Sequence, residues 1–362
     1  MHLIELLTLR SRPAAGLYLL LTRRCPLLCA HCSTSSTLDS EEVAEEDLLR
    51  FVNTLTPDCR PEIIFLSGGE PLLRPRLVRQ IAEKAHSCGA RVVMITGMFF
   101  ARQAKIPRLI EEALAEPDHI MTSLDIFHER QVPRENVLRV VRKLVDSGKD
   151  VSIQIAGWNE RDPYLREVTT SVREYLDDRV PMLVETLKCL GRAKQLQQLQ
   201  MFRPPDPISQ TEPAPCVMTS WPVITWNGTI VACCNEDVVD GIDAPHLRLG
   251  HIATEDWQTV RDRHLQSKMV RILRTFGPIY VNKQYGSEKV SCDGYCPTCH
   301  KLSADSVLVD RVEEVMARPA AAYLERQLTV IQQQRHAAYS DIAMYGHLVK
   351  LGYKGQEMYA SE

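Results

Sequence analysis

The sequence has no apolar run that approaches the length of a membrane span, and Met1–Gly16 carries no apolar segment behind a basic start. We therefore expect neither a membrane anchor nor a secretory signal. The formal net charge of −3 leaves no basic stripe for nucleic acid. With 44% hydrophobic and 25% charged residues in 362, the composition is that of a soluble globular protein, with room for one large α/β domain and a smaller module.

Cysteine, by contrast, is abundant. Twelve cysteines are too many for a typical cytosolic enzyme, in which thiols stay reduced. The missing secretory signal argues against a disulfide framework. Metal ligation therefore explains the cysteine content better, and we expect a protein of the reducing cytoplasm.

Between Gly16 and about Lys188, short apolar runs alternate with amphipathic stretches. The expected strands are Leu17–Thr22, Glu62–Leu66, Arg91–Thr96, His119–Leu124, Asp150–Ala156 and Val180–Thr186. The expected helices are Glu41–Thr56, Arg74–Ser87, Pro107–Glu116, Arg134–Ser147 and Tyr164–Leu176. This alternation predicts a parallel α/β sheet with right-handed crossovers and an active site at the carboxyl ends of its strands.

Cys25, Cys29 and Cys32 follow the first of these strands at the spacing C-x3-C-x2-C. Three thiolates on one loop can hold three corners of an iron–sulfur cube and leave the fourth iron open as a reaction site. A zinc site would favour four ligands in paired C-x2-C units, and inert core cysteines rarely cluster so tightly. The second motif, Gly68-Gly69-Glu70-Pro71, directly follows the second apolar strand.

Together the two motifs resemble the radical SAM enzymes. The resemblance implies a partial (β/α)6, TIM-like barrel and a [4Fe-4S] cluster whose open iron chelates the methionine end of S-adenosylmethionine. Electron transfer would then cleave this cofactor to a 5′-deoxyadenosyl radical that abstracts a hydrogen atom from the substrate.

The same resemblance suggests residues that bind the cofactor. Glu70 should reach the methionine amino group, while Gly68 and Gly69 let the backbone approach it closely. His31 occupies the position of an aromatic residue near the adenine, although it could be a solvent-facing spacer. Ser123 and Asp125 resemble a strand end near the methionine carboxylate or ribose; a helix N-cap at Asp125 is the alternative.

Further candidates concern the substrate. His128 and Glu129 follow Asp125 on the substrate side of the barrel mouth and could bind substrate or transfer protons, or they are surface polar residues. Cys189 follows the last strand and could donate a hydrogen atom to a substrate radical, or it packs inertly. Cys59 and Cys88 lie at the opposite end of the barrel and are expected to be inert.

A second group of cysteines follows a proline-rich linker that begins at Arg203-Pro204-Pro205-Asp206-Pro207. It comprises Cys216, Cys233, Cys234, Cys292, Cys296 and Cys299. Thr225–Ile230 between them reads as a β-hairpin whose Asn-Gly turn needs positive φ. The group resembles the SPASM or twitch module. By motif position, one auxiliary [4Fe-4S] cluster would be held by Cys216, Cys233, Cys296 and Cys299. Cys234 and Cys292 stay doubtful, and a structural zinc ribbon is the alternative.

These features divide the chain into four expected parts. They are an N-terminal extension over 1–16, a radical SAM core barrel over 17–202, a SPASM/twitch-like auxiliary domain over 203–302 and a helical tail over 303–362 without an assignable motif.

The resemblance implies an oxidoreductase that modifies a ribosomally synthesised peptide. Dehydrogenation or epimerisation of a small molecule such as an aminocyclitol or sugar is the alternative. A non-catalytic iron–sulfur scaffold or electron carrier would have no use for Gly68-Gly69-Glu70 beside an open iron. An external reductant such as flavodoxin or ferredoxin is an expected partner. The barrel begins almost at once, without an amino-terminal leader-binding domain; this weakens the peptide reading and adds a discrete leader-peptide-binding protein to the expected partners.

Overall fold

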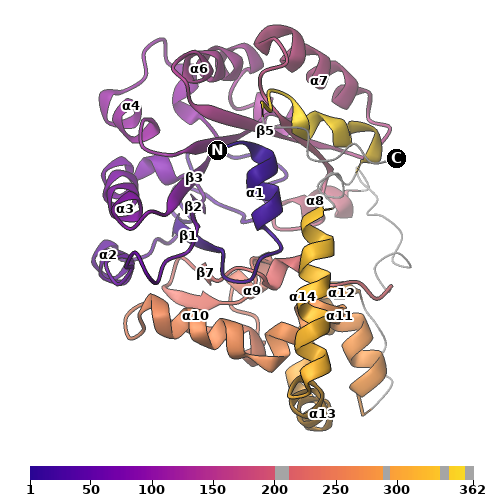
Figure 1. Ribbon diagram of the computed structural model, residues 1–362. Coiled ribbons are helices and arrows are strands. Elements are labelled where there is room, and N and C mark those ends of the chain that lie inside the picture. Colours follow the sequence, from indigo (N-terminus) through magenta and orange to yellow (C-terminus); the bar gives the residue numbers. More distant parts are fainter. Residues whose placement is uncertain (200–211, 288–293, 335–341, 355–362) are drawn as a thin grey trace.

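One mixed sheet organises the part of the chain that the computed structural model describes, which comprises residues 1–199, 212–287, 294–334 and 342–354 (Figure 1). Its strands lie in the order β6-β5-β4-β3-β2-β1-β7-β8-β9. They are β1 Gly16–Thr22, β2 Ile63–Gly68, β3 Arg91–Thr96, β4 His119–Ser123, β5 Asp150–Gly157, β6 Met182–Thr186, β7 Val223–Ile224, β8 Thr229–Val231 and β9 Arg248–His251. Strands β1 to β6 pair in parallel. The predicted α/β fold with a TIM-like barrel is confirmed.

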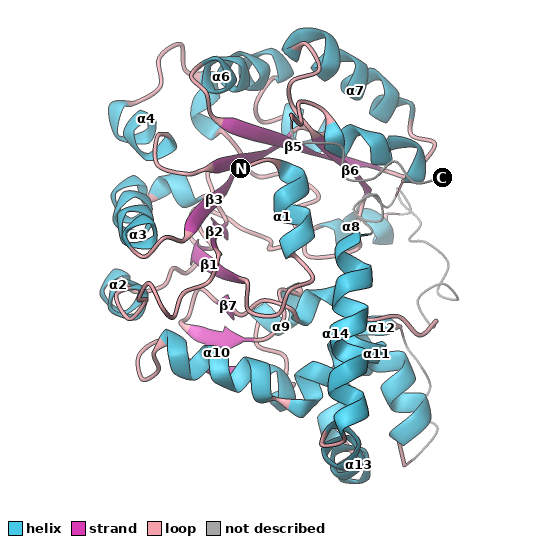
Figure 2. Cartoon of the chain, in the orientation of Figure 1, coloured by secondary structure: helices cyan, strands magenta, loops and turns pink. Residues whose placement is uncertain are grey.

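Helices cover the outer face of this curved sheet (Figure 2). The α-helices are α1 Leu3–Leu9, α2 Glu45–Val52, α3 Pro75–Ser87, α4 Arg108–Leu114, α5 Ile126–Glu129, α6 Arg134–Asp146, α7 Pro163–Leu176, α8 Ala193–Gln198, α9 Glu236–Val239, α10 Trp257–Gln266, α11 Lys268–Tyr285, α12 Tyr295–Lys301, α13 Ser306–Met316 and α14 Pro319–Gln334. The 3-10 helices are η1 Pro71–Leu73, η2 Phe99–Arg102, η4 Val217–Thr219, η5 Pro245–Leu247, η6 Leu302–Ala304 and η8 Ala343–Lys350. The helices predicted between barrel strands are α2, α3, α4, α6 and α7.

Alternation along the barrel strands separates two apolar layers. Leu17, Leu19 and Leu21 of β1 are fully buried in the main core, which lies between the sheet and the surrounding helices. The intervening Tyr18 and Leu20 point to the inner face of the barrel, where they line a cavity. Burial of the outer layer is the main force that holds the helices on the sheet.

The amino-terminal helix α1 lies inside the curve of the sheet, against the inner face of the barrel (Figure 2). Its leucines, including Leu3 and Leu6, pack with Phe65, Trp221 and Val349 in a separate buried cluster. Met1–Gly16 was expected only as an extension, so this packing is new. Helix α1 therefore fills part of the inner face, and the cavity described below lies at the carboxyl ends of the strands.

The expected hairpin is present and continues the barrel sheet. Strand β7 pairs in parallel with β1 through Tyr18↔Val223 and Leu19↔Ile224, while β8 and β9 add antiparallel strands. In the connecting turn Gly228 takes a φ of 84°, whereas Asn227 accepts a hydrogen bond from Thr229 N through its side chain at 3.0 Å. The positive φ predicted for the Asn-Gly turn is therefore found at the glycine, where it costs least.

Helices α10, α11 and α13 lie below the barrel in Figure 1, and α14 runs from α13 up toward α1. Helix α11 bends at Gly277, whose φ of 75° interrupts the helical backbone just before Pro278. In the described part of the chain, no helix combines the length and apolar character needed to cross a membrane. The start of the expected linker, Arg203–Pro207, and the doubtful ligand Cys292 lie outside the described residues.

Candidate active site

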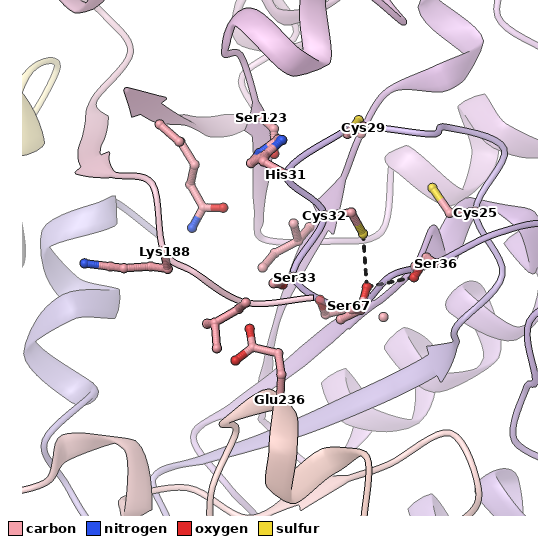
Figure 3. Close-up of a pocket in the computed structure, with 18 of the residues that line it drawn as sticks. Cys25, Cys29, His31, Cys32, Ser33, Ser36, Ser67, Ser123, Lys188 and Glu236 are labelled. Atoms are coloured by element: carbon pink, nitrogen blue, oxygen red, sulfur yellow. Dashed lines mark hydrogen bonds between the residues drawn. The ribbon is translucent and has the colours of Figure 1, made fainter. Parts of the chain in front are cut away.

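A cavity of about 490 Å³ opens at the carboxyl ends of the parallel strands (Figure 3). Its wall contains Cys25, Cys29, His31, Cys32, Gly68, Gly69, Ser123, Asp125 and His128, together with further polar residues from β5, β6 and α9. Segments that are far apart in the sequence meet here because parallel strands present all their carboxyl ends at one edge. The cavity therefore gathers most of the residues that the sequence motifs single out.

The loop after β1 presents its three cysteines to this cavity. Its ends are held together by the hydrogen bond from Cys25 N to Thr37 O at 3.0 Å, and Cys32 N donates to Cys29 O at 3.1 Å within it. Burial raises the pKa of Cys25 and of Cys29 to about 12. Because the thiolate is the metal ligand, a bound cation would have to offset this cost by its own charge.

The glycines after β2 lie tightly against the start of that loop. A Cβ atom on Gly68 would lie 2.1 Å from Thr22 O, and one on Gly69 would lie 2.4 Å from Arg24 O. Gly68 also has a φ of 128°. No side chain fits at either position, so the backbone of this motif is held at the cavity wall beside the cysteines.

The carboxylate of Glu70 turns away from the cavity and is fully buried. It accepts hydrogen bonds from Leu72 N at 3.0 Å, from Gly97 N at 2.9 Å and from the Thr96 hydroxyl at 3.0 Å. Burial raises the pKa of Glu70 to about 7, although these hydrogen bonds act to lower it. These contacts join the ends of β2 and β3, and the predicted contact of Glu70 with the methionine amino group stays a prediction.

Asp125 carries out two tasks at the end of β4. Its Oδ1 accepts hydrogen bonds from Phe127 N and His128 N, both at 2.9 Å, so it caps the short helix α5. Its Oδ2 lies 3.2 Å from Nε2 of His31, whose ring stacks on Phe127 with centroids 4.7 Å apart. Burial alone would raise the pKa of Asp125, but His31, His128 and the capped amide together lower it. The expected N-cap and the expected cavity position therefore both occur.

His128 lies on the cavity wall, as expected, and is almost fully buried. Its Nε2 donates to Gly97 O at 2.6 Å, which leaves Nδ1 buried without a partner among the described residues. Burial lowers the pKa of this imidazole. A neutral ring with one free acceptor nitrogen can receive a hydrogen bond from a bound molecule.

Two predicted catalytic residues lie outside the cavity. The Glu129 carboxylate faces Arg134 at 2.6 Å and Tyr164 Oη at 2.7 Å, because these partners on α6 and α7 draw it to the outer surface. The thiol of Cys189 hydrogen-bonds to Gln197 and packs beside a small apolar cluster that includes Phe127. Neither side chain forms part of the cavity wall.

The second group of cysteines converges from three segments. Cys216 precedes η4, Cys233 follows β8, and Cys296 and Cys299 lie one turn apart on α12. Cys216, Cys233 and Cys299 are buried. Burial raises the pKa of Cys233 and of Cys299 well above its usual value, and the charge of Cys216 adds to the effect on both. The charge of Cys216 thus acts on both Cys233 and Cys299.

Cys234 differs from these four because it lies on the wall of the barrel cavity. Its Sγ accepts a hydrogen bond from Arg10 Nη2 at 3.3 Å, and the Arg10 guanidinium also covers the Trp221 ring at 4.9 Å. Burial raises the pKa of this thiol, while Arg10 opposes the shift. The sequence leaves Cys234 as a doubtful cluster ligand, and the structure places its side chain on the cavity wall.

No three His, Cys, Asp or Glu side chains in the described ranges form a group that could hold a single metal ion. A cubane cluster distributes its cysteine ligands over separate irons, so thiols that bind one need not converge on a single point. His246 is the nearest described histidine contact of the second group, with Nε2 3.8 Å from Cys299 Sγ. The donor set is all sulfur at the first site and mainly sulfur at the second, which suits iron–sulfur ligation.

Several wall residues carried no sequence signal. Strands β5 and β6 and the connection after β6 contribute Gln154, Glu185 and Lys188 to the wall. Since active sites lie at the carboxyl ends of parallel strands, these residues could have been predicted from their position. Arg192 and Glu236 come from the connections before α8 and at the start of α9, and no motif marks them.

Comparison with known proteins agrees with this geometry. Residues 19–169 match the family model of the radical SAM superfamily. A PqqA peptide cyclase of Methylocella silvestris is 36% identical over 111 residues, which cover 30% of this chain and 28% of that protein. A probable GTP 3′,8-cyclase of Methanothermobacter marburgensis is 35% identical over 85 residues, or 24% of this chain and 28% of that protein.

The chain therefore aligns with less than a third of the length of either relative. The crystal structure of Streptococcus suis SuiB bound to S-adenosylmethionine superimposes with a TM-score of 0.49 and 13% identity, covering 76% of this chain and 75% of that one. The segment that matches the radical SAM family model, residues 19–169, holds both the cysteine loop and the glycine motif.

Proposed function

We propose that this protein is a radical SAM oxidoreductase that cleaves S-adenosylmethionine reductively and oxidises a bound substrate, with a ribosomally synthesised peptide as the leading substrate class. One observation carries the proposal. The thiols of Cys25, Cys29 and Cys32 line the same cavity as the backbone of Gly68 and Gly69. The match of residues 19–169 to the radical SAM family supports it independently.

The residues present fit a [4Fe-4S] cluster with S-adenosylmethionine. Three thiols on one loop supply three ligands, and the glycines leave the backbone bare beside them. When bound, these groups would supply a 5′-deoxyadenosyl radical by one-electron reduction, methionine leaving as the sulfonium bond breaks. The protein contributes position and exclusion of water.

The chain's own residues have distinct tasks in this proposal. Gly68 and Gly69 offer backbone groups to the methionine end of the cofactor. His31, held by Asp125, presents a ring at the cavity wall for the adenine. His128 offers its free Nδ1 to the cofactor or substrate. Glu70, whose carboxylate is buried against Thr96, fixes the glycine motif and is a positioning residue.

The second group of cysteines would hold one auxiliary [4Fe-4S] cluster through Cys216, Cys233, Cys296 and Cys299. Their burial and mutual electrostatic influence support a shared site. Cys234, which lies on the cavity wall, directly follows Cys233 in the sequence, so this auxiliary site would be next to the cavity. The auxiliary site would accept the electron that a substrate radical loses, which makes the net reaction an oxidation. An external reductant such as flavodoxin or ferredoxin would supply the first electron in the cytoplasm.

The substrate class rests on the relatives and on the cavity. The matched PqqA peptide cyclase favours a peptide, which a separate leader-peptide-binding protein would present. A small molecule is the second candidate, because a cavity of about 490 Å³ lies in the range of small-ligand sites and the other relative named above is a GTP cyclase. The polar wall of Gln154, Glu185 and Lys188 suits either class.

Substitution of the three loop cysteines tests the proposal. The Cys25→Ala, Cys29→Ala, Cys32→Ala variant should form no 5′-deoxyadenosine from S-adenosylmethionine and dithionite under anaerobic conditions. Cys59→Ala is the matched control, because that thiol lies at the opposite end of the barrel. Persistent cleavage in the triple variant would show that the site lies elsewhere. With a candidate peptide encoded by a neighbouring gene, mass spectrometry should find a product lighter by two hydrogens for each 5′-deoxyadenosine. An unchanged mass with solvent deuterium at carbon would indicate epimerisation.

A further inference from the structure

A short segment after β6 docks on the cysteine loop from the other side of the barrel. Arg192 makes three hydrogen bonds to it: the backbone N donates to Cys32 O at 2.9 Å, Nε donates to Cys29 O at 2.9 Å, and Nη1 donates to Ser36 O at 2.6 Å. The acceptors are carbonyl groups at three points of one loop. A single planar guanidinium therefore ties the middle of the loop to its end.

The residue before it makes the same contact through the backbone. Gly191 has a φ of 50°, and a Cβ atom there would lie 2.1 Å from Ser33 O and 2.4 Å from Cys32 O. Backbone atoms cannot move aside as a flexible side chain can. This close approach requires glycine, so the segment and the loop are fitted to each other.

One nitrogen of Arg192 is not used by the protein. Nη2 is buried and has no hydrogen-bond partner in the described residues, although Arg192 lines the cavity with Cys25, Cys29 and Cys32. The two arginines that begin the loop are engaged elsewhere. Arg23 pairs with Glu41 at 3.0 Å and donates to Thr34 O at 2.8 Å, and Arg24 donates to Leu38 O at 2.8 Å. A buried cationic donor without a partner is costly unless a bound acceptor completes it.

We propose that Arg192 is the positioning residue of the cysteine loop and the cationic partner of the cluster that this loop holds. The inference rests on the proposed function, since it needs an iron–sulfur cluster at Cys25, Cys29 and Cys32. Charge near such a cluster and hydrogen bonds to its sulfurs set its reduction potential. A fixed positive charge favours the reduced, more negative form. Arg192 thus raises the potential and makes the reducing step accessible to a biological donor.

Two substitutions separate the hydrogen bonds of Arg192 to the loop from the effect of its positive charge. Arg192→Lys keeps a positive charge, but a single ammonium cannot reproduce the fork between Cys29 O and Ser36 O. Arg192→Gln loses both. Arg24→Gln is the matched control, because Arg24 lies on the same loop with a half-exposed side chain that bonds to a backbone carbonyl.

The first measurement needs no cluster. In apo-protein, hydrogen exchange of the amides between Cys25 and Ser36 should be faster in both Arg192 variants than in wild type and unchanged in Arg24→Gln. The second is an anaerobic redox titration of the cluster whose EPR signal responds to S-adenosylmethionine. Its potential should shift to more negative values in Arg192→Gln by an amount equivalent to about tenfold in the one-electron equilibrium, or about 59 mV. Arg192→Lys should shift it less.

The outcomes are distinguishable. If wild-type protein binds no cluster that requires the three loop cysteines, the proposed function itself fails. If that cluster assembles but Arg192→Gln leaves both exchange and potential at wild-type values, the role of Arg192 is refuted. If Arg192→Gln does not assemble a cluster, two measurements still test the proposal. Unchanged hydrogen exchange in the apo-protein of both variants would refute the positioning role of Arg192. A cluster potential in Arg192→Lys lower by the full shift of about 59 mV would refute the role of its positive charge.

Discussion

The Thr96 hydroxyl lies 3.0 Å from both carboxylate oxygens of Glu70, behind the wall of the cavity. This contact ties the glycine motif after β2 to the end of β3. It explains why a motif glutamate is fully buried although its neighbours Gly68 and Gly69 face the cavity. The pair therefore holds the backbone that a cofactor would touch.

The buried carboxyl predicts a pH dependence of folding. The pKa of Glu70 rises from 4.5 to about 7, so in this interval the folded protein retains a proton that the unfolded chain releases. Stability therefore falls as the pH rises through this interval and stays lower above it; for one buried group the change is about 3 kcal/mol. Urea unfolding should give a lower unfolding free energy at about pH 8 than at about pH 5 in wild type. In Glu70→Gln this decrease should be smaller by about 3 kcal/mol. Glu62→Gln, at an ion pair with Arg12 near the surface, should behave as wild type. Equal pH dependence in wild type and Glu70→Gln would contradict the assignment.

The two cysteine groups predict the metal content. Protein purified without oxygen should contain about eight irons and eight sulfides per chain, from two cubane clusters. Cys216→Ala or Cys296→Ala should remove about half of the iron, stop product formation and leave 5′-deoxyadenosine formation largely intact. Circular dichroism must accompany the assay, because loss of a metal site can unfold its module. About four irons with one zinc per chain would identify the second site as a zinc ribbon and remove the electron acceptor from the proposal.

Asp125 allows its two tasks to be separated. Asp125→Asn keeps an oxygen that can cap α5 but loses the charge that faces His31. It should weaken binding of S-adenosylmethionine, measured by calorimetry, with little change in unfolding free energy. Asp125→Ala should lose the cap as well, at about 1 kcal/mol. Because the pKa of Asp125 is lowered, its contribution to stability is present at neutral pH and is lost as the pH falls through the folded value. Unchanged cofactor binding in Asp125→Asn would restrict the residue to the cap.

Three side chains near the barrel mouth should respond differently to removal. Cys234→Ala should reduce product formation, because this thiol lies on the cavity wall beside Arg10. Cys189→Ala and Glu129→Gln should leave turnover near the wild-type value, since neither side chain reaches the cavity. Glu129→Gln should instead lower the melting temperature by weakening the contacts to Arg134 and Tyr164. Assays with each variant at equal iron content would show a reversed order if Cys189 supplied a hydrogen atom.

Local pattern accounts for what could be predicted. The predicted bounds of the strand Arg91–Thr96 are those of β3, because a short uninterrupted apolar run between turn residues indicates a buried strand. The cysteine loop and glycine motif follow strand ends, and parallel topology alone then brings them together. Side-chain direction is a different matter. Glu129 follows His128 directly, yet partners on α6 and α7 turn it outward.

Long-range contacts account for most of what was missed. Arg192 reaches Cys29 across 163 residues, and no local spacing marks such a contact. Helix α1 had a readable signal, since Leu3, Leu6 and Leu7 recur at helical spacing after the capping His2. Its destination inside the barrel depends on how strongly the sheet curves, which is a property of the whole fold.

The pairing of β7 with β1 means that the two cysteine groups share one hydrogen-bonded sheet. Removing the region that carries β7 would expose the edge of β1. It would also remove Trp221, whose ring lies over Tyr18 on the inner face of the barrel, and so uncover Tyr18. An exposed apolar edge strand promotes pairing between chains. A truncated protein that retains only the barrel segment should therefore aggregate, because the second region covers this edge of the barrel whether or not it holds a metal.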